Sequence, residues 1–256
     1  MDLAPPADAA CLFALAAAAL VVAFARQLFA ARARVFVACA AACATALSAA
    51  YVAVYLRGGP RIVDATSYLL EARALAEGHL TFALGEPAAS TIGRFLVRPT
   101  GDAAHAAVIF PPGYPALLAL GVLVGAPLAV GPALAAALVV ATYALARRVE
   151  GGADDACARV AAMLSVACAA LRYHTADTMS HGLAAACFTG ALGAAFASTD
   201  ALAAADRRGA SLYALAAGAC AGWLVATRPV SGLALAAALT FSVATRAVRA
   251  PPRLVA

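Results

Sequence analysis

The chain has 256 residues, of which 65% are hydrophobic and 12% are charged. Soluble globular domains are about 45–50% apolar and about 25% charged, so a soluble fold of this length could not bury so much apolar surface. The net charge of +5 comes from arginine, since the sequence contains no lysine, and the arginines form no dense run that would follow a phosphate backbone. Composition therefore predicts an all-α polytopic membrane protein and indicates no nucleic-acid partner.

Seven apolar segments are predicted to cross the bilayer; a spanning helix usually has about 20 residues, and several of these segments are shorter and rich in alanine. The first follows an N-terminus without the positive charge of a signal peptide, so we expect it to be retained. The predicted spans are Ala9–Ala25, Val35–Leu56, Gly131–Ala146, Ala158–Leu171, Gly182–Ser198, Ala210–Ala226 and Val230–Thr245. Together they predict a single transmembrane domain over residues 1–256, in which the GxxxG spacing of Gly218 and Gly222 favours close helix packing.

The apolar run from Ala116 to Ala146 is too long for one span and too short for two, which would need about 40 residues. Pro127 and Pro132 interrupt it, because proline lacks the amide proton that a helix interior uses. We therefore predict a half-depth helix over Tyr114–Ala126, followed by one true span.

This choice also collects most short-loop arginines on one side, as expected for the cytoplasmic side of a membrane. The N-terminus and the loop of residues 57–110 are then outside, and the C-terminus is cytoplasmic. The absence of lysine and the alanine-rich composition are typical of a GC-rich bacterial genome, so the predicted location is a bacterial inner membrane.

The outside loop contains a short amphipathic helix, predicted over residues 64–78 and expected to lie on the membrane surface. Asp64 is suited to the N-cap, where its carboxylate would accept from amides of the first turn. Gly78 is suited to the C-terminal stop. Asp64, Tyr68 and Glu71 share one face of this helix. A second apolar element begins at Phe110.

The cysteines are expected to be buried free thiols. None forms a CxxC pair, and most lie inside apolar runs, where cysteine behaves as a small hydrophobic residue. We expect neither a disulfide framework nor a metal site from them.

Several motifs together resemble a known family. A span is followed by an outside Asp64 and Tyr68, then by the surface helix, then by Pro-Pro-Gly-Tyr-Pro-Ala-Leu-Leu-Ala-Leu at residues 111–120. Segments 143–148 and 222–229 agree as well. This order resembles the GT-C superfamily of membrane glycosyltransferases, most closely the family 39-like branch of protein O-mannosyltransferases and the aminoarabinose transferase of lipid A. The resemblance extends roughly over residues 35–245.

The resemblance implies transfer of a sugar from a polyprenyl-phosphate donor to a hydroxyl of a glycan, lipid or protein acceptor on the external face. Membrane lipids would be the other partners. The family often has two adjacent acidic residues where this chain has Asp64 and Ala65. Its members are typically longer, so we expect this chain to correspond to their N-terminal half.

Such a transfer needs a carboxylate that accepts the proton of the acceptor and cations that hold the departing phosphate. Asp64 is the expected catalytic base, the alternative being a role as helix cap only. Tyr68 would contact the substrates. Arg94 and Arg98 would grip the donor phosphate with their guanidinium forks, or else extend to lipid headgroups.

Four further residues are candidates for binding donor or acceptor. His105 would contact either substrate or else be a solvated loop residue, and Arg228 would line the donor cavity or cap helix carbonyls. His174 and Asp177 share a helical spacing with His181, which favours a polar cluster and, more weakly, a divalent metal. The predicted enzyme needs no metal and no other cofactor.

Two other functions compete with the transferase. A transporter or flippase would place ionisable residues near the bilayer midplane or use broken helices, whereas here the charges are predicted at helix ends and outside. A non-catalytic membrane subunit or truncated remnant would use the polar loop only to bind a partner.

Overall fold

The computed structural model describes residues 29–83, 95–97, 104–151 and 154–249 and the isolated helical positions 16, 19, 23 and 27, with side chains up to residue 242. Its elements, in chain order, are α2 (Ala33–Ala50), a π-helical turn η1 (Tyr51–Tyr55), α3 (Val63–Ala76), β1 (Phe82–Ala83), β2 (Leu96–Val97), β3 (His105–Val108), α4 (Gly113–Leu123), a 3₁₀ turn η4 (Pro127–Ala129), α5 (Val130–Glu150), α6 (Ala156–Ala167), α7 (Ala169–Ala176), α8 (Ser180–Ala203), α9 (Arg207–Thr227) and α10 (Pro229–Arg249).

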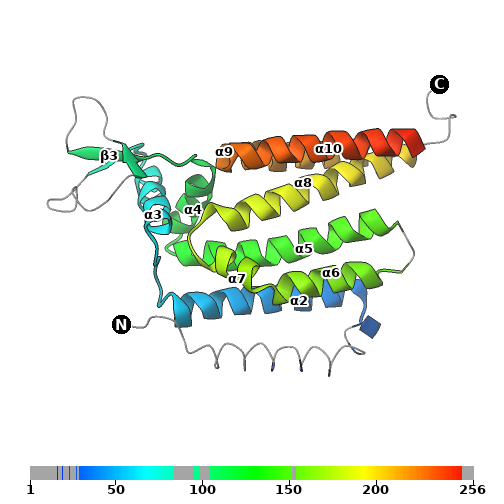
Figure 1. The fold of residues 1–256 in the computed structure, drawn as a ribbon, viewed down its shortest axis with the longest axis horizontal. Helices are drawn as coiled ribbons and strands as arrows, with labels where there is room; N and C mark the ends of the chain where they lie inside the picture. Colours follow the sequence, from blue (N-terminus) through cyan, green and yellow to red (C-terminus); the bar gives the residue numbers. More distant parts are fainter. Residues whose placement is uncertain are drawn as a thin grey trace.

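The long helices lie side by side along the long axis of the molecule (Figure 1). Helix α5 packs against α2, α6 and α8, and α8 packs in turn against α9. At one end lie α3, α4 and the strands, together with the α7–α8 and α9–α10 connections; we call it the loop end. The α5–α6 and α8–α9 connections lie at the opposite end, which we call the far end (Figure 1).

Among the described residues, four helices are long and apolar enough to cross a membrane, and a bent pair would make a fifth. The four are Ala33–Tyr55, Pro127–Glu150, Ser180–Ala203 and Arg207–Thr227. A chain with these helices is a membrane-embedded helical protein. The predicted span Ala9–Ala25 lies outside the described residues, apart from isolated helical positions. In α10 the apolar segment is shorter, Pro229–Ser242.

The predicted span Ala158–Leu171 is not one continuous helix. The chain instead forms α6 and α7, which are bent by 59° relative to each other. Cys168 between them has a non-helical ψ of 109°, so carbonyls at the end of α6 lose their helical partners. Arg172 supplies a donor near this break, since its Nη2 donates to the carbonyl of Ser165 at 3.1 Å. Its Nη1 donates to the carbonyl of Ala44 on α2 at 3.2 Å. Arg172, predicted in a short outside loop, therefore lies buried within the bundle.

The apolar run after the loop divides where proline and length predict. Helix α4 has 11 residues, hence a length of about 16 Å, roughly half of the 30 Å hydrocarbon core of a bilayer. It starts one residue earlier and ends three residues earlier than the predicted Tyr114–Ala126. Gly125, with a φ of 73°, lets the chain turn into η4 and then α5.

Helix α4 is fixed against the end of α9 by a close approach. A Cβ atom at Gly113 would lie 2.5 Å from the Oγ1 of Thr227, so this position requires glycine. Here Trp223 Nε1 donates to the Gly113 carbonyl at 2.9 Å. The pair places the Pro-Pro-Gly-Tyr-Pro motif beside the α9–α10 connection.

Two details of the predicted loop and bundle differ in the structure. The loop contains a small antiparallel sheet in the order β1-β3-β2, in which Phe82 pairs with Ala106 and Leu96 with Val108; the all-α prediction contains no strands. A Cβ atom at Gly218 or Gly222 would meet nothing within 4 Å. Their GxxxG spacing therefore does not mark close packing with any described helix of this chain.

The largest apolar core of the described residues lies toward the loop end and joins six helices. It buries one leucine from each of α3, α4, α5, α8, α9 and α10: Leu69, Leu118, Leu134, Leu183, Leu224 and Leu235. Burying a leucine side chain contributes about 1.5–3 kcal/mol. This core therefore fixes α3 relative to the α7–α8 and α9–α10 connections, which carry the polar groups described next.

Candidate functional site

A pocket of about 370 Å³ opens at the loop end. Its volume is within the range of about 300–1,000 Å³ that is usual for ligand sites. The lining comes from α3, from the segment before α4, and from the α7–α8 and α9–α10 connections: Asp64, Tyr68, Phe110, Pro111, Met179, Ser180, His181, Thr227, Arg228, Pro229 and Val230. A carboxylate, a phenol, an imidazole and a guanidinium from distant parts of the sequence thus share one space.

Helix α3 supplies Asp64 and Tyr68, which are four residues apart and therefore on one helix face. Tyr68 is 5% exposed and stacks on Phe110 with ring centroids 4.7 Å apart. Its hydroxyl donates to Ser180 Oγ at 3.1 Å. Burial raises the pKa of Tyr68, so the phenol is a proton donor to its neighbours at neutral pH.

Asp64 is not the N-cap of α3, contrary to the prediction. The cap residue is Ile62, with no side-chain cap hydrogen bond, and Asp64 lies in the first helical turn. A carboxylate at this end of a helix is stabilised by the helix dipole. Asp64 is partly exposed and lines the pocket. The helix ends near the predicted stop, with Gly78 at a φ of 81°.

Arg228 is the cation of the pocket and occupies the non-helical position between α9 and α10. Its Nη1 lies 2.8 Å from His181 Nδ1 and 3.4 Å from Ser180 Oγ. A guanidinium can only donate, so the imidazole nitrogen that faces it accepts. Tyr68 and Arg228 thus both donate to Ser180, which joins α3 to the α9–α10 connection.

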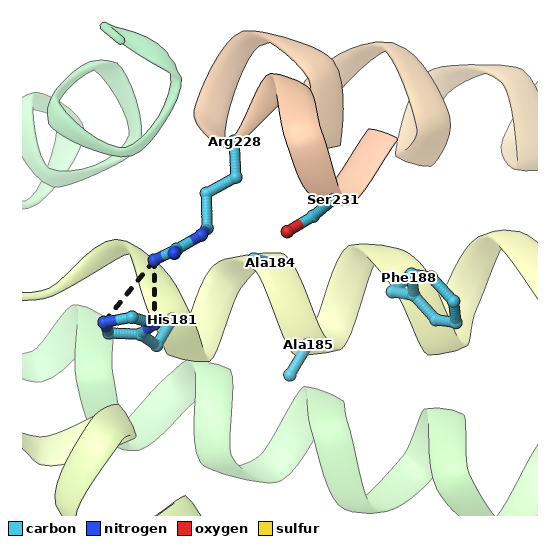
Figure 2. Close-up of a pocket in the computed structure, with 6 residues that line it drawn as sticks. All are labelled: His181, Ala184, Ala185, Phe188, Arg228 and Ser231. Carbon is cyan, nitrogen blue, oxygen red and sulfur yellow. Dashed lines mark hydrogen bonds between the residues drawn. The ribbon is translucent and has the colours of Figure 1, made fainter. Parts of the chain in front are cut away.

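A second pocket of about 290 Å³ shares His181 and Arg228 with the first. Its other lining residues are Ala184, Ala185, Phe188 and Ser231. Figure 2 shows Arg228 extending toward His181, with Phe188 further along α8. Both pockets therefore have mixed polar and apolar linings, and the His181–Arg228 pair belongs to both.

His174 and Asp177 lie beside the pocket and do not line it. The prediction that they share one helix face with His181 is wrong, because α7 ends at Ala176 and α8 begins at Ser180. The turn between the helices nevertheless brings the rings of His174 and His181 to 4.6 Å between centroids.

Asp177 is 1% exposed, and its Oδ2 has no hydrogen-bond partner among the described residues. Its Oδ1 accepts from the amide of Thr178 at 2.9 Å, and burial raises its pKa. No group of three or more His, Cys, Asp or Glu residues that could hold a metal ion occurs in the described part of the chain.

The remaining predicted site residues are not brought into the pocket. His105 is on β3, half-buried, and pairs with Ala83 of β1. Arg94 and Arg98 lie outside the described residues. Their predicted grip on a donor phosphate stays a prediction.

The prediction did not include Ser180, His181, Phe110 and Glu71 as site residues. Glu71 is one turn beyond Tyr68 on the same face of α3, its Oε2 has no partner among the described residues, and burial raises its pKa from 4.5 to about 7. The signal for Glu71 was visible, since it follows Asp64 and Tyr68 at helical spacing in an apolar helix. Ser180 gives no such signal, and His181 stands out in the sequence only by its spacing from His174 and Asp177. Long-range packing places both residues next to Arg228.

Comparisons with known proteins do not assign the chain. No family model matches it, no curated protein matches it, and no solved structure matches it.

Proposed function

We propose that this protein is a membrane glycosyltransferase that moves a sugar from a polyprenyl-phosphate donor to an acceptor hydroxyl on the external face of the membrane. The single observation that carries the proposal is the meeting of Asp64, Tyr68 and Arg228 in one pocket, although Arg228 is far from the other two in sequence. Two of the motifs on which the GT-C resemblance is based, Asp64–Tyr68 and the segment ending at Pro229, thus line the same space.

The chemistry of the pocket fits this reaction. The carboxylate of Asp64 accepts the proton of the acceptor hydroxyl, and the acceptor oxygen forms a bond to the anomeric carbon of the sugar. The bond between that carbon and the phosphate oxygen breaks, and polyprenyl phosphate leaves as an anion. Arg228 stabilises the negative charge that develops on the departing phosphate. Tyr68, held by Ser180, orients the reacting groups.

Two pockets that share His181 and Arg228 suit a donor with two parts. In this proposal the phosphate and sugar occupy the pocket that Asp64 lines, and the first part of the prenyl chain extends past Ala184, Ala185 and Phe188. Arg228 lies at the junction of the two, where the phosphate of such a molecule connects its polar and apolar parts.

The arginine distribution supports an external position for the pocket. The far end carries Arg34 at the start of α2, Arg147 and Arg148 at the end of α5, and Arg207 and Arg208 at the start of α9. Short cytoplasmic loops are enriched in arginine. We therefore place the far end in the cytoplasm and the loop end outside, in a bacterial inner membrane crossed by about seven spans, including Ala9–Ala25.

A transfer assay in membranes tests the proposal. Membranes containing the wild type are incubated with a panel of polyprenyl-phosphate sugars labelled in the sugar, and label transferred to endogenous acceptors is measured. We expect transfer with at least one donor and its loss in Asp64→Asn. Glu77→Gln is the matched control, because Glu77 is an exposed carboxylate at the other end of α3. Equal transfer by Asp64→Asn and wild type would favour a non-catalytic role of the pocket.

One observation favours a second function. The bent pair α6–α7 and the buried Arg172 are features that transporters use at their substrate sites. Against this, Arg172 donates to carbonyls of α2 and α6 and so has a structural role at the break. Reconstituted protein tests the alternative: a flippase would expose fluorescent polyprenyl phosphate of the inner leaflet to a reductant added outside, and a transferase would not.

A further inference from the structure

We propose that His181 is a positioning residue that holds the guanidinium of Arg228 at the junction of the two pockets, through a hydrogen bond accepted by its ring nitrogen. This inference rests on the proposed function, in which Arg228 binds the donor phosphate. It adds a residue to which the proposed chemistry gives no role.

Arg228 needs such a partner because nothing in its own segment fixes its side chain. It lies between two helices, with a φ of −148° and a ψ of 89°, and a long arginine side chain has many rotamers. A phosphate site formed by a freely rotating guanidinium would lose binding free energy to ordering of that side chain. A hydrogen bond made before the ligand arrives removes part of this cost.

His181 is suited to provide this contact because its own position is tightly determined. It is in the first turn of α8, and the next residue, Gly182, packs so closely on α7 that a Cβ atom there would lie 3.0 Å from the His174 carbonyl. The His174 ring lies 4.6 Å from the His181 ring on the other side of this contact. The imidazole therefore offers Arg228 a fixed acceptor at 2.8 Å.

The contact leaves the rest of the guanidinium for a ligand. Within the described part of the chain, the bonds of Arg228 to His181 and Ser180 both go through Nη1. Nη2 and Nε remain to donate, and two parallel donors are the arrangement in which arginine binds an oxyanion of phosphate. Both partners of Nη1 are neutral acceptors, so the positive charge stays available to an anionic ligand. His181 and Arg228 line both pockets, so the guanidinium group of Arg228 lies where the two pockets meet.

Two substitutions of His181 distinguish loss of the hydrogen-bond acceptor from loss of the packing of its ring. Asn at position 181 would keep an amide oxygen near the place of Nδ1, whereas Leu would keep the bulk and remove the acceptor. We expect His181→Leu to weaken binding of an anionic lipid by about tenfold, as for the loss of one hydrogen bond to a charged group. His181→Asn should recover most of that affinity. Neutral lipid binding should be the same in all three proteins.

The experiment is a titration of the purified protein in detergent with farnesyl phosphate and, separately, with farnesol. The single tryptophan, Trp223, lies on α9 one turn before the pocket residue Thr227 and provides the fluorescence signal. His79→Leu, a substitution of an exposed histidine outside the pocket, is the matched control.

Four outcomes decide the matter. Weaker farnesyl phosphate binding in His181→Leu, with recovery in His181→Asn and unchanged farnesol binding, supports the positioning role. Equal losses in both variants, or equal losses for both lipids, overturn it in favour of ring packing. If Arg228→Gln loses phosphate binding and His181→Leu does not, the proposed function stands and the positioning role is overturned. If the wild type binds farnesol and farnesyl phosphate equally, the phosphate site itself is contradicted, and with it both proposals.

Discussion

The two ends of the helical bundle use their charged residues in opposite ways. At the far end, Asp155 binds Arg159 at 2.7 Å, accepts a hydrogen bond from Tyr143 at 2.5 Å, and lies 3.9 Å from Arg147. The hydrogen bond from Arg159 is the main reason why the pKa of Asp155 is below its usual range. The carboxylate of Asp155 is thus paired with side chains of the same chain.

At the loop end, the charges are close together without such pairing. Arg228 contacts two neutral groups, Ser180 and His181. Among the described residues, five buried side-chain atoms have no hydrogen-bond partner: Glu71 Oε2, His174 Nδ1 and Asp177 Oδ2 near the loop end, and Ser165 Oγ and Arg172 Nε at the α6–α7 break. Buried polar groups are usually satisfied, so the three near the loop end are consistent with the ligand site proposed there. The comparison teaches that charged groups at the far end pair within the chain, whereas Arg228 at the loop end has no carboxylate partner among the described residues.

The largest expected effect is a loss of stability when the ion pair at the far end is removed. Arg159 is 5% exposed, and Asp155→Asn would remove the carboxylate that it contacts at 2.7 Å. We expect a loss of about 3 kcal/mol of stability, as for other buried pairs that lose one partner, and unchanged lipid binding. Thermal unfolding in detergent measures it. Asp200→Asn, which removes an exposed pair with Arg148, is the control and should change stability by less than about 1 kcal/mol.

The complementary change is at the loop end. Arg228→Gln removes the cation of the pocket, and we expect affinity for farnesyl phosphate to fall by about 2 kcal/mol, roughly 30-fold, the cost of losing a charge-assisted bond. The unfolding temperature should stay near that of the wild type, because Arg228 has no carboxylate partner among the described residues. If Arg228→Gln unfolds at a lower temperature than the wild type and binds farnesyl phosphate normally, the roles assigned to the two ends are contradicted.

A pH dependence of stability should come from α3. Burial raises the pKa of Glu71 from 4.5 to about 7, so between these values the folded protein holds a proton that the unfolded chain has released. Stability should therefore be greatest below pH 4.5, fall as the pH rises to about 7, and level off above. We expect a change of about 1–3 kcal/mol.

Unfolding temperatures measured from pH 4.5 to pH 8 check this dependence. In Glu71→Gln the fall should be clearly smaller, since an amide does not titrate; what remains has the sign expected of Asp177, whose pKa is also raised by burial. In Glu77→Gln, which alters an exposed carboxylate on the same helix, the full fall should remain. A fall of unchanged size in Glu71→Gln would assign the dependence to another group.

The smallest effect compares two tyrosines, one at each end. Tyr68→Phe keeps the stack on Phe110 and loses the bond to Ser180 Oγ, and Tyr143→Phe loses the bond to Asp155. Each should cost about 1 kcal/mol of stability. Only Tyr68→Phe should also weaken binding of farnesyl phosphate, by a few-fold, because only its partner Ser180 contacts Arg228. A weaker binding in Tyr143→Phe would show that the ends are coupled.

The sequence predicted the features that depend on local chemistry. The end of α3 at Gly78, the shortness of α4, and the apolar helices α2, α5, α8 and α9 follow from glycine, proline and hydrophobic periodicity. Membership of Asp64, Tyr68 and Arg228 in one pocket could be expected only from the family resemblance.

Features that depend on long-range contacts were missed. The break at Cys168 involves neither proline nor glycine there, and the contacts that Arg172 makes across it include the carbonyl of Ala44 on another helix. Asp64 is not at the cap position because α3 begins two residues earlier than that position requires, at Val63, with Ile62 as the cap. Ser180 and His181 reach the pocket only because the turn after α7 folds back under α3, where Thr178 donates to the Ala65 carbonyl.

The measurement that tests the central claim most directly is mass profiling of glycolipids and surface polysaccharides in a strain that lacks this protein. The strain is complemented with the wild type, with Asp64→Asn, or with Glu77→Gln, at matched protein levels. A pocket that transfers sugar predicts that one sugar-sized mass is lost in the deletion strain and returns with the wild type and Glu77→Gln only. An unchanged profile in the deletion strain, or full restoration by Asp64→Asn, would contradict it.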